Sequence, residues 1–256
     1  MTAPAELDEA LAGLAGRRPL LLASDYDGVL SPLHDDPSAA VPEPGAGEVL
    51  ERLAAVDGVT VALVSGRGVA DLQRTSGFTG PFRWVGSHGA EFDGPLSGEL
   101  AARRDRVAAL LQPLVDGTPG ARLEVKPASV AVHVRQVTDR DRAAGLLAEA
   151  RTRADSSLTM KPGKDVLELA VTDADKGSAL RRLGAELGAA ATLYLGDDVT
   201  DEDAFRALGA GDVTVKIGEG STDARYRVAD PAAAVALLRR LAALLDQRPR
   251  VGADPE

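Results

Sequence analysis

The sequence contains no cysteine among its 256 residues. This absence excludes disulfides, thiolate zinc sites, iron–sulfur clusters and a cysteine nucleophile. Aromatic residues make up only 3% of the chain, so we do not expect binding of single-stranded nucleic acid by base stacking. No apolar run approaches the roughly 20 residues that span a bilayer, and we therefore expect a soluble, cytoplasmic protein.

Basic residues are in the minority. The chain has 39 Asp and Glu residues against 29 Lys and Arg residues, which gives a formal charge of −10 at pH 7. An acidic surface repels nucleic-acid backbones and anionic membranes, so neither is an expected partner. An anionic substrate would need a local basic pocket to overcome this repulsion.

Short apolar runs that end in turn residues recur along the chain. They cover residues 19–24, 59–64, 191–195 and 212–217. Runs of this kind without polar alternation predict strands that are buried on both faces of a parallel sheet. Apolar stripes at helical spacing predict helices over residues 45–57, 176–188 and 231–247. This alternation predicts an α/β fold whose core is a doubly wound parallel sheet.

The middle of the chain has a different pattern. It predicts helices over residues 99–115 and 138–154, a hairpin over 122–126 and 129–135, and a further strand over 165–171. A small α+β unit inserted into the larger domain explains this change. We therefore expect a core domain of residues 1–98 and 172–256, and an inserted domain of residues 99–171.

Four polar clusters occur where strands end or helices begin. They are Asp25-Tyr26-Asp27-Gly28, Ser65-Gly66-Arg67, Asp175-Lys176-Gly177 and the acidic run from Gly196 to Asp203. Each of them alone is typical of an ordinary turn or helix cap. Ligands of open α/β sheets, however, bind outside the carboxyl ends of the strands. The joint occurrence of the four clusters at that edge is the strongest functional signal in the sequence.

The chemistry of these clusters favours phosphate and a hard cation. Paired carboxylates such as Asp25 and Asp27 can supply a nucleophile or metal ligand and an acid/base. A hydroxyl such as that of Ser65, beside backbone N–H groups, can hold a phosphate oxygen. The five acids between residues 197 and 203 repel one another unless a cation lies among them, and oxygen ligands suit Mg²⁺.

Together the four clusters resemble those of the haloacid dehalogenase superfamily of aspartyl phosphotransferases. A closer resemblance, to the trehalose-6-phosphate phosphatase family, extends over nearly the whole chain. Its further motifs are Ser31-Pro32, Gly86-Ser87-His88-Gly89-Ala90-Glu91, Glu124-Val125-Lys126, His133-Val134-Arg135, residues 164–168, and Ala204-Phe205 after the acidic run. The resemblance implies a Rossmann-like core, an inserted α/β cap domain and Mg²⁺ as cofactor. The implied reaction is hydrolysis of trehalose-6-phosphate, a small sugar phosphate, by an enzyme expected to be monomeric.

The resemblance also implies roles for the core residues. Asp25 attacks phosphorus and forms an aspartyl-phosphate, and Asp27 protonates the departing sugar oxygen and then activates water. Mg²⁺ is bound by the Asp25 side chain, the Asp27 backbone carbonyl and Asp197. Ser65 and Lys176 bind the phosphoryl group. Two further groups complete this set: Gly66 and Arg67 as substrate-binding residues, and Asp198 and Asp201 as residues that orient water ligands or Lys176.

The cap residues are expected to bind the sugar. Carboxylate and cation pairs suit hydroxyl groups, and the cap motifs supply several of both. The expected sugar-binding residues are Glu124, Lys126, His133, Arg135, Lys164 and Glu168.

Two alternatives remain open. A related sugar phosphatase could act on sucrose-phosphate, mannosyl-3-phosphoglycerate or glucosylglycerol-phosphate, and core motifs do not separate these substrates. A phosphate-binding, receiver-like protein without catalysis is the other alternative. Receivers are about half this length and carry no inserted domain. The presence of both Asp25 and Asp27 favours turnover, because a receiver needs no acid for a leaving group.

Overall fold

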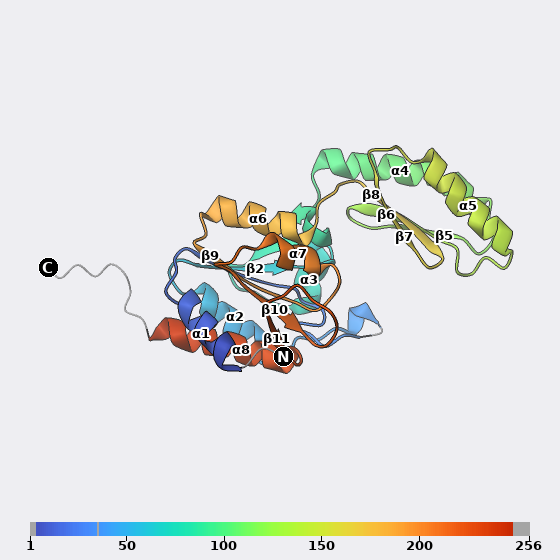
Figure 1. The fold of residues 1–256 in the computed structure, drawn as a ribbon. Helices are drawn as coiled ribbons and strands as arrows, with labels where there is room; N and C mark the ends of the chain where they lie inside the picture. Colours follow the sequence, from blue (N-terminus) through green and yellow to red (C-terminus); the bar gives the residue numbers. More distant parts are fainter. Residues whose placement is uncertain (1–3, 35, 248–256) are drawn as a thin grey trace. The chain divides into compact units, whose positions relative to one another are not determined.

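A computed structural model describes residues 4–34 and 36–247 of the chain (Figure 1). The chain divides into two compact units, one formed by the residues up to Asp93 and from Asp175 onward, the other by Gly94–Ala174. The predicted boundaries, after residues 98 and 171, differ from these by a few residues. Within the described residues, none of the helices has the length and apolar character needed to cross a bilayer.

The larger unit is built on a sheet with the strand order β11-β10-β9-β1-β2-β3-β4. Neighbouring strands are parallel except for β4, which runs antiparallel to β3. The strands are β1 (Leu20–Ser24), β2 (Val59–Val64), β3 (Arg83–Gly86), β4 (Glu91–Phe92), β9 (Ala191–Gly196), β10 (Val213–Ile217) and β11 (Tyr226–Val228). The α/β class with a parallel core sheet, predicted from the sequence, is confirmed.

The central strands are buried on both faces, as their unbroken apolar sequences predict. In β1, Leu20 and Leu22 belong to one hydrophobic cluster and Leu21 and Ala23 to another. Figure 1 shows α1, α2 and α8 on one face of this sheet, and α6 and α7 on the other. The helices of the unit are α1 (Pro4–Leu14), α2 (Ala46–Ala54), α3 (Val69–Ser76), α6 (Lys176–Leu187), α7 (Asp201–Ala207) and α8 (Pro231–Asp246).

Local sequence explains where α6 and α7, the helices that carry Lys176 and Asp201, begin. At α6, the Asp175 side chain accepts a hydrogen bond from the Ser178 N–H, and the Ser178 hydroxyl bonds back to Asp175 in a capping box. This cap fixes Lys176 in the first turn of α6. At α7, three acidic residues lie in the first turn, where they interact favourably with the helix dipole.

The smaller unit is an antiparallel sheet with two helices. Its strand order is β5-β6-β8-β7. The elements are α4 (Gly98–Asp116), β5 (Arg122–Val125), β6 (Ser129–His133), α5 (Arg140–Arg153), β7 (Thr159–Gly163) and β8 (Val166–Ala170). Val130, Val132, Leu167 and Leu169 alternate along β6 and β8 and are buried.

The other face of this small sheet is polar. The register places Glu124 opposite Ala131 and Ala131 opposite Glu168, so the two glutamates lie on the same face. Lys161 on the edge strand β7 pairs with Glu168 and adds a basic group to that face. A sheet with one apolar and one polar face offers the polar face for ligand contacts.

Candidate active site

The site begins at the ends of two adjacent parallel strands. Ser24, the last residue of β1, pairs with Leu195 in β9, so Asp25 and Asp197 follow neighbouring strand ends. The Asp25 N–H donates to the Leu195 carbonyl at 3.0 Å, which fixes the start of the loop. Asp25 is 6% exposed. The register of the sheet thus brings together two carboxylates that lie far apart in sequence.

Lys176 lies between two buried carboxylates. Its Nζ is 2.5 Å from Oδ2 of Asp25 and 2.7 Å from Oδ1 of Asp201, and its side chain is 1% exposed. Burial raises the pKa of Asp25 above its ordinary value, the Lys176 ammonium opposes this shift, and the negative charge of Asp201 adds to it. Burial by itself would lower the pKa of Lys176, but the two carboxylates outweigh it and raise that pKa. Lys176 is therefore a permanent cation beside the candidate nucleophile.

Asp201 is fully buried and has its hydrogen-bonding capacity filled by the protein. One oxygen accepts from Lys176 and from the hydroxyl of Tyr194 at 2.5 Å. The other accepts from the backbone N–H groups of Asp197 and Asp198, both at 2.9 Å. Asp201 therefore connects Lys176 to the loop that carries Asp197. The orienting role that the family resemblance implies for it stays a prediction.

Asp197 approaches the first loop because Gly28 has no side chain. A Cβ added at Gly28 would lie 2.0 Å from Oδ2 of Asp197, and the φ of +73° at Gly28 suits glycine as well. Burial, followed by the charges of Asp25 and Asp201, raises the pKa of Asp197 to about 7. The Asp197 carboxylate is thus held close to other negative charges, where a cation would stabilise it.

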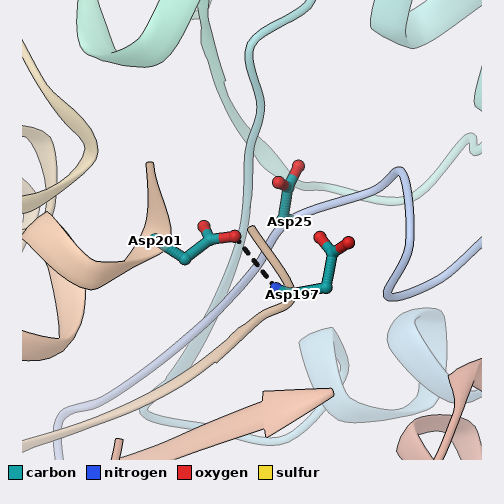
Figure 2. Close-up of side chains that lie close together, drawn as sticks. All are labelled: Asp25, Asp197 and Asp201. Atoms are coloured by element: carbon teal, nitrogen blue, oxygen red, sulfur yellow. Dashed lines mark hydrogen bonds between the residues drawn. The ribbon is translucent and has the colours of Figure 1, made fainter. Parts of the chain in front are cut away.

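The acidic residues fit a hard divalent cation. Oxygen atoms of Asp25, Asp197 and Asp201 all lie within 4.8 Å of one another. Figure 2 shows the side chains of Asp25 and Asp197 side by side, with the Asp201 carboxylate directed at the backbone nitrogen of Asp197. Since Asp201 already accepts four hydrogen bonds, Asp25 and Asp197 are the side chains better suited to ligate an ion.

Asp27 is paired with Arg67 rather than with Asp25. Arg67 Nε and Nη2 each donate to one carboxylate oxygen of Asp27, both at 2.7 Å, in a two-pronged ion pair. The same guanidinium contacts Asp71 at 3.0 Å and the carbonyl of Pro37. The Arg67 side chain is only 9% exposed. In this arrangement the guanidinium nitrogens donate to protein groups, and the main contact of Arg67 is its ion pair with the Asp27 carboxylate.

Ser65 and Asp198 occupy contrasting environments. Ser65 follows β2 and is 1% exposed, and its Oγ accepts the Arg67 N–H at 3.2 Å. Asp198 is exposed, and its carboxylate accepts the N–H of Val199 at 2.6 Å. The partners of the Lys176 ammonium are Asp25 and Asp201, so Asp198 does not orient it here.

Four of the predicted sugar-binding residues of the smaller unit form two pairs, and the other two are exposed. Lys126 lies 2.8 Å from Glu168, which also accepts a hydrogen bond from Ser129 at 2.6 Å. Burial acts to raise the pKa of Glu168, but these two hydrogen bonds, together with the charges of Lys126 and Lys161, outweigh it and lower that pKa. His133 Nε2 lies 2.7 Å from Oε2 of Glu124. Two predicted residues, Arg135 and Lys164, are exposed in turns.

Three residues near the site were not given a role from the sequence. Tyr194 is fully buried and bonds Asp201, and Glu91 is a buried carboxylate in β4. Lys216 on β10 is 5% exposed and donates from Nζ to the backbone carbonyl of Asp197. A lysine within the apolar run of residues 213–217 is unusual, and that irregularity was a signal for a role at the site.

An open α/β sheet with buried aspartates and a buried lysine at its carboxyl edge, and with a second α/β unit inserted, is the arrangement of the haloacid dehalogenase fold class. Comparison with known families narrows this class. The model of the trehalose-phosphatase family matches residues 23–232. The chain therefore belongs to the trehalose-phosphatase family.

Individual relatives agree with this assignment. A trehalose-phosphate phosphatase of Mycolicibacterium paratuberculosis is 38% identical over 261 residues, covering 92% of this chain and 65% of the relative. One of Mycobacterium marinum is 36% identical, covering 91% and 64%. The crystal structure of Aspergillus fumigatus trehalose-6-phosphate phosphatase is 28% identical with a TM-score of 0.74, covering 93% of this chain and 97% of that one. The chain thus spans slightly less than two thirds of the length of the bacterial relatives.

Proposed function

We propose that the chain is a Mg²⁺-dependent phosphatase that hydrolyses trehalose-6-phosphate to trehalose and phosphate. The observation that carries the proposal is the buried lysine held between two aspartates at the carboxyl edge of the sheet, with a third carboxylate beside them. Phosphate-monoester hydrolysis needs an in-line nucleophile and positive charge around an anionic group, and this set of residues supplies both. Membership of the trehalose-phosphatase family supports the choice of sugar. A monomeric state and a cytoplasmic location stay predictions.

Asp25 is the proposed nucleophile. One of its carboxylate oxygens forms a bond to phosphorus while the bond between phosphorus and the sugar oxygen breaks, which leaves an aspartyl-phosphate. Asp27 donates a proton to the departing sugar oxygen. In the second step it accepts a proton from the attacking water, whose oxygen bonds to phosphorus while the bond between phosphorus and Asp25 breaks, which releases phosphate and restores the Asp25 carboxylate. The first of these roles requires that the Asp27 carboxyl group leaves Arg67. Lys176 and Ser65 bind the phosphoryl oxygens.

Asp25 and Asp197 are the proposed side-chain ligands of the cation, together with the backbone carbonyl of Asp27. When bound, Mg²⁺ supplies positive charge that neutralises the carboxylates and the phosphoryl group. Asp201 keeps Asp197 in place through its bond to the backbone, and Asp198 takes no part in holding Lys176. Gly66 contributes its backbone N–H to phosphate binding.

The polar face of the smaller sheet is the proposed sugar-binding surface. Its pairs of Lys126 with Glu168 and of His133 with Glu124 present donors and acceptors in a fixed geometry, which suits sugar hydroxyl groups. Arg135 and Lys164, which are exposed, have side chains free to adjust to a ligand at the margin of this surface.

Phosphate release from a panel of sugar phosphates tests the substrate. The panel contains trehalose-6-phosphate, sucrose-phosphate, mannosyl-3-phosphoglycerate and glucosylglycerol-phosphate, each with Mg²⁺ and with a chelator. We expect kcat/KM for trehalose-6-phosphate to exceed the others by at least about ten-fold, which corresponds to roughly 1.4 kcal/mol. A ten-fold preference for another member would show that trehalose-6-phosphate is not the substrate. If no member is turned over, the chain is better explained as a phosphate-binding protein without catalysis.

Asp25→Asn tests the nucleophile. The substitution keeps the shape of the side chain but removes its nucleophilic oxygen pair, so turnover should fall to background and no phosphoenzyme should form. Asp246→Asn is the matched control, because Asp246, the last residue of α8, forms a surface ion pair with Arg52 of α2 and is 48% exposed. Near-normal turnover in Asp25→Asn would remove Asp25 from the mechanism.

A further inference from the structure

The segment Gly86-Ser87-His88-Gly89-Ala90-Glu91 adopts an uncommon backbone conformation. Ser87 and His88 have φ values of +50° and +57°, in the left-handed region that residues with a side chain rarely adopt. Two successive left-handed residues cost conformational energy, so tertiary contacts must hold them in place. The mechanism proposed above gives this segment no role.

A buried carboxylate holds the left-handed turn. Glu91 is 5% exposed, and its Oε2 accepts the hydroxyl of Ser87 at 2.7 Å. The same oxygen accepts the backbone N–H of Val69 at 3.3 Å. Val69 is the first residue of α3 and is separated from Ser65-Gly66-Arg67 by Gly68 alone, so a single carboxylate ties the turn to the end of the loop that carries Ser65.

The left-handed turn is fastened to this loop by its backbone as well. The N–H of Ser87 donates to the Arg67 carbonyl at 2.7 Å, and the N–H of His88 donates to the Ser65 carbonyl at 3.0 Å. The imidazole of His88 packs on Gly66. A Cβ added at Gly66 would lie 2.6 Å from Cε1 of His88, so only glycine leaves room for the ring there.

On its other side the segment meets the start of α6. A Cβ added at Gly89 would lie 2.6 Å from the carbonyl oxygen of Asp175, the residue before Lys176. The segment therefore fills the space between the loop of Ser65 and the helix end that carries Lys176. It thus contacts both the loop and the helix start that carry the two groups proposed to bind the phosphoryl oxygens.

We propose that Glu91 and His88 are positioning residues of the phosphoryl-binding site, with Glu91 fixing the left-handed turn and His88 packing on Gly66 so that its peptide N–H keeps the direction needed to bind a phosphoryl oxygen. This inference rests on the proposed function, in which Ser65 and Gly66 bind that group. Neither Glu91 nor His88 needs to touch the substrate for this role.

Direct binding of inorganic phosphate tests the proposal. Phosphate is titrated calorimetrically into the full chain at saturating Mg²⁺, and Mg²⁺ affinity is measured separately. Glu91→Met removes the carboxylate and should weaken phosphate binding by at least about ten-fold, because two buried donors lose their acceptor. Glu91→Gln retains an oxygen that can accept both bonds and should restore binding to within about three-fold of wild type. Mg²⁺ affinity should not change in either variant.

Asp212→Leu is the matched control for a purely structural effect. Like Glu91, Asp212 accepts two hydrogen bonds, here from the backbone N–H groups of Thr192 at 2.8 Å and Gly209 at 2.7 Å, but it lies at the opposite end of β9. We expect it to lower thermal stability and leave phosphate affinity unchanged. If Asp212→Leu weakens phosphate binding as much as Glu91→Met, or if folded Glu91→Met binds phosphate normally, the positioning role is wrong.

Two further variants keep the test decisive if Glu91→Met does not fold. Ser87→Ala removes only the hydroxyl on Glu91 and should weaken phosphate binding by about three-fold or more, while unchanged binding would contradict the proposal. Gly66→Ala should weaken binding through its clash with His88, and adding His88→Ala should restore part of the loss. The absence of any recovery would remove His88 from the proposal.

Ser65→Ala separates this inference from the proposed function. If phosphate affinity falls in Ser65→Ala but not in Glu91→Met, only the positioning role fails. If Ser65→Ala binds phosphate as the wild type does, the proposed phosphoryl-binding site itself is wrong.

Discussion

Asp197→Asn is expected to stabilise the metal-free protein at neutral pH, although it removes a proposed metal ligand. In the folded chain, burial and the charges of Asp25 and Asp201 raise the pKa of Asp197 from 3.8 to about 7. The folded state therefore holds this proton more tightly than the unfolded chain does. It follows that the contribution of Asp197 to the free energy of unfolding falls as the pH rises from about 4 to about 7, and is fully present only below that window.

The magnitude follows from the size of the shift. A difference of about three pKa units corresponds to roughly 4 kcal/mol as an upper limit. Asp197 is partly accessible to water, which screens its repulsion, so we expect about 2 kcal/mol between pH 4 and pH 7.5. Asn has no charge to repel, so metal-free Asp197→Asn should be more stable than wild type by about this amount at pH 7.5, and equal to it near pH 4.

Urea denaturation at several pH values, with a chelator and with Mg²⁺, measures these differences. Mg²⁺ at about 100 times its Kd should stabilise wild type by roughly 2.7 kcal/mol at pH 7.5 and should have little effect on Asp197→Asn. Asp198→Asn, which removes the same charge from an exposed neighbour, is the matched control and should change stability little. A metal-free wild type whose stability is flat or rises over this window would refute the reasoning, as would an Asp197→Asn variant that is no more stable at pH 7.5.

Two further predictions concern neighbouring residues. Lys216→Met removes the ammonium that holds the Asp197 carbonyl, so Mg²⁺ affinity measured by calorimetry without substrate should fall by about ten-fold; an unchanged Kd in a folded variant would exclude this support role. Asp27→Asn should slow first-turnover release of a sugar by roughly 10²-fold but affect first-turnover release of p-nitrophenolate much less, because nitrophenolate leaves without a proton. Equal losses for both leaving groups would contradict Asp27 as the general acid.

The strands that carry the candidate site could be predicted because their sequences are simple. Unbroken apolar runs that end in Asp25, Ser65 and Gly196 have one stable placement, between two layers of helices. The edge strand β7 was missed, since its residues Lys161, Pro162 and Gly163 are typical of a turn. Proline is tolerated there because an edge strand leaves one side of its backbone without a partner strand.

The sequence alone determined which residue types stand at the strand ends and helix starts, since strands and caps depend on a few neighbouring residues. Only the tertiary structure decided which of them meet. Lys176 is 151 residues from Asp25, and nothing local to either indicates that it lies between Asp25 and Asp201. Local sequence likewise does not indicate that Arg67 pairs with Asp27, that Lys216 donates to the Asp197 carbonyl, or that Glu91 accepts a hydrogen bond from Ser87. Hydrogen bonds between side chains depend on sheet register and close packing at ångström precision, and these are properties of the assembled fold.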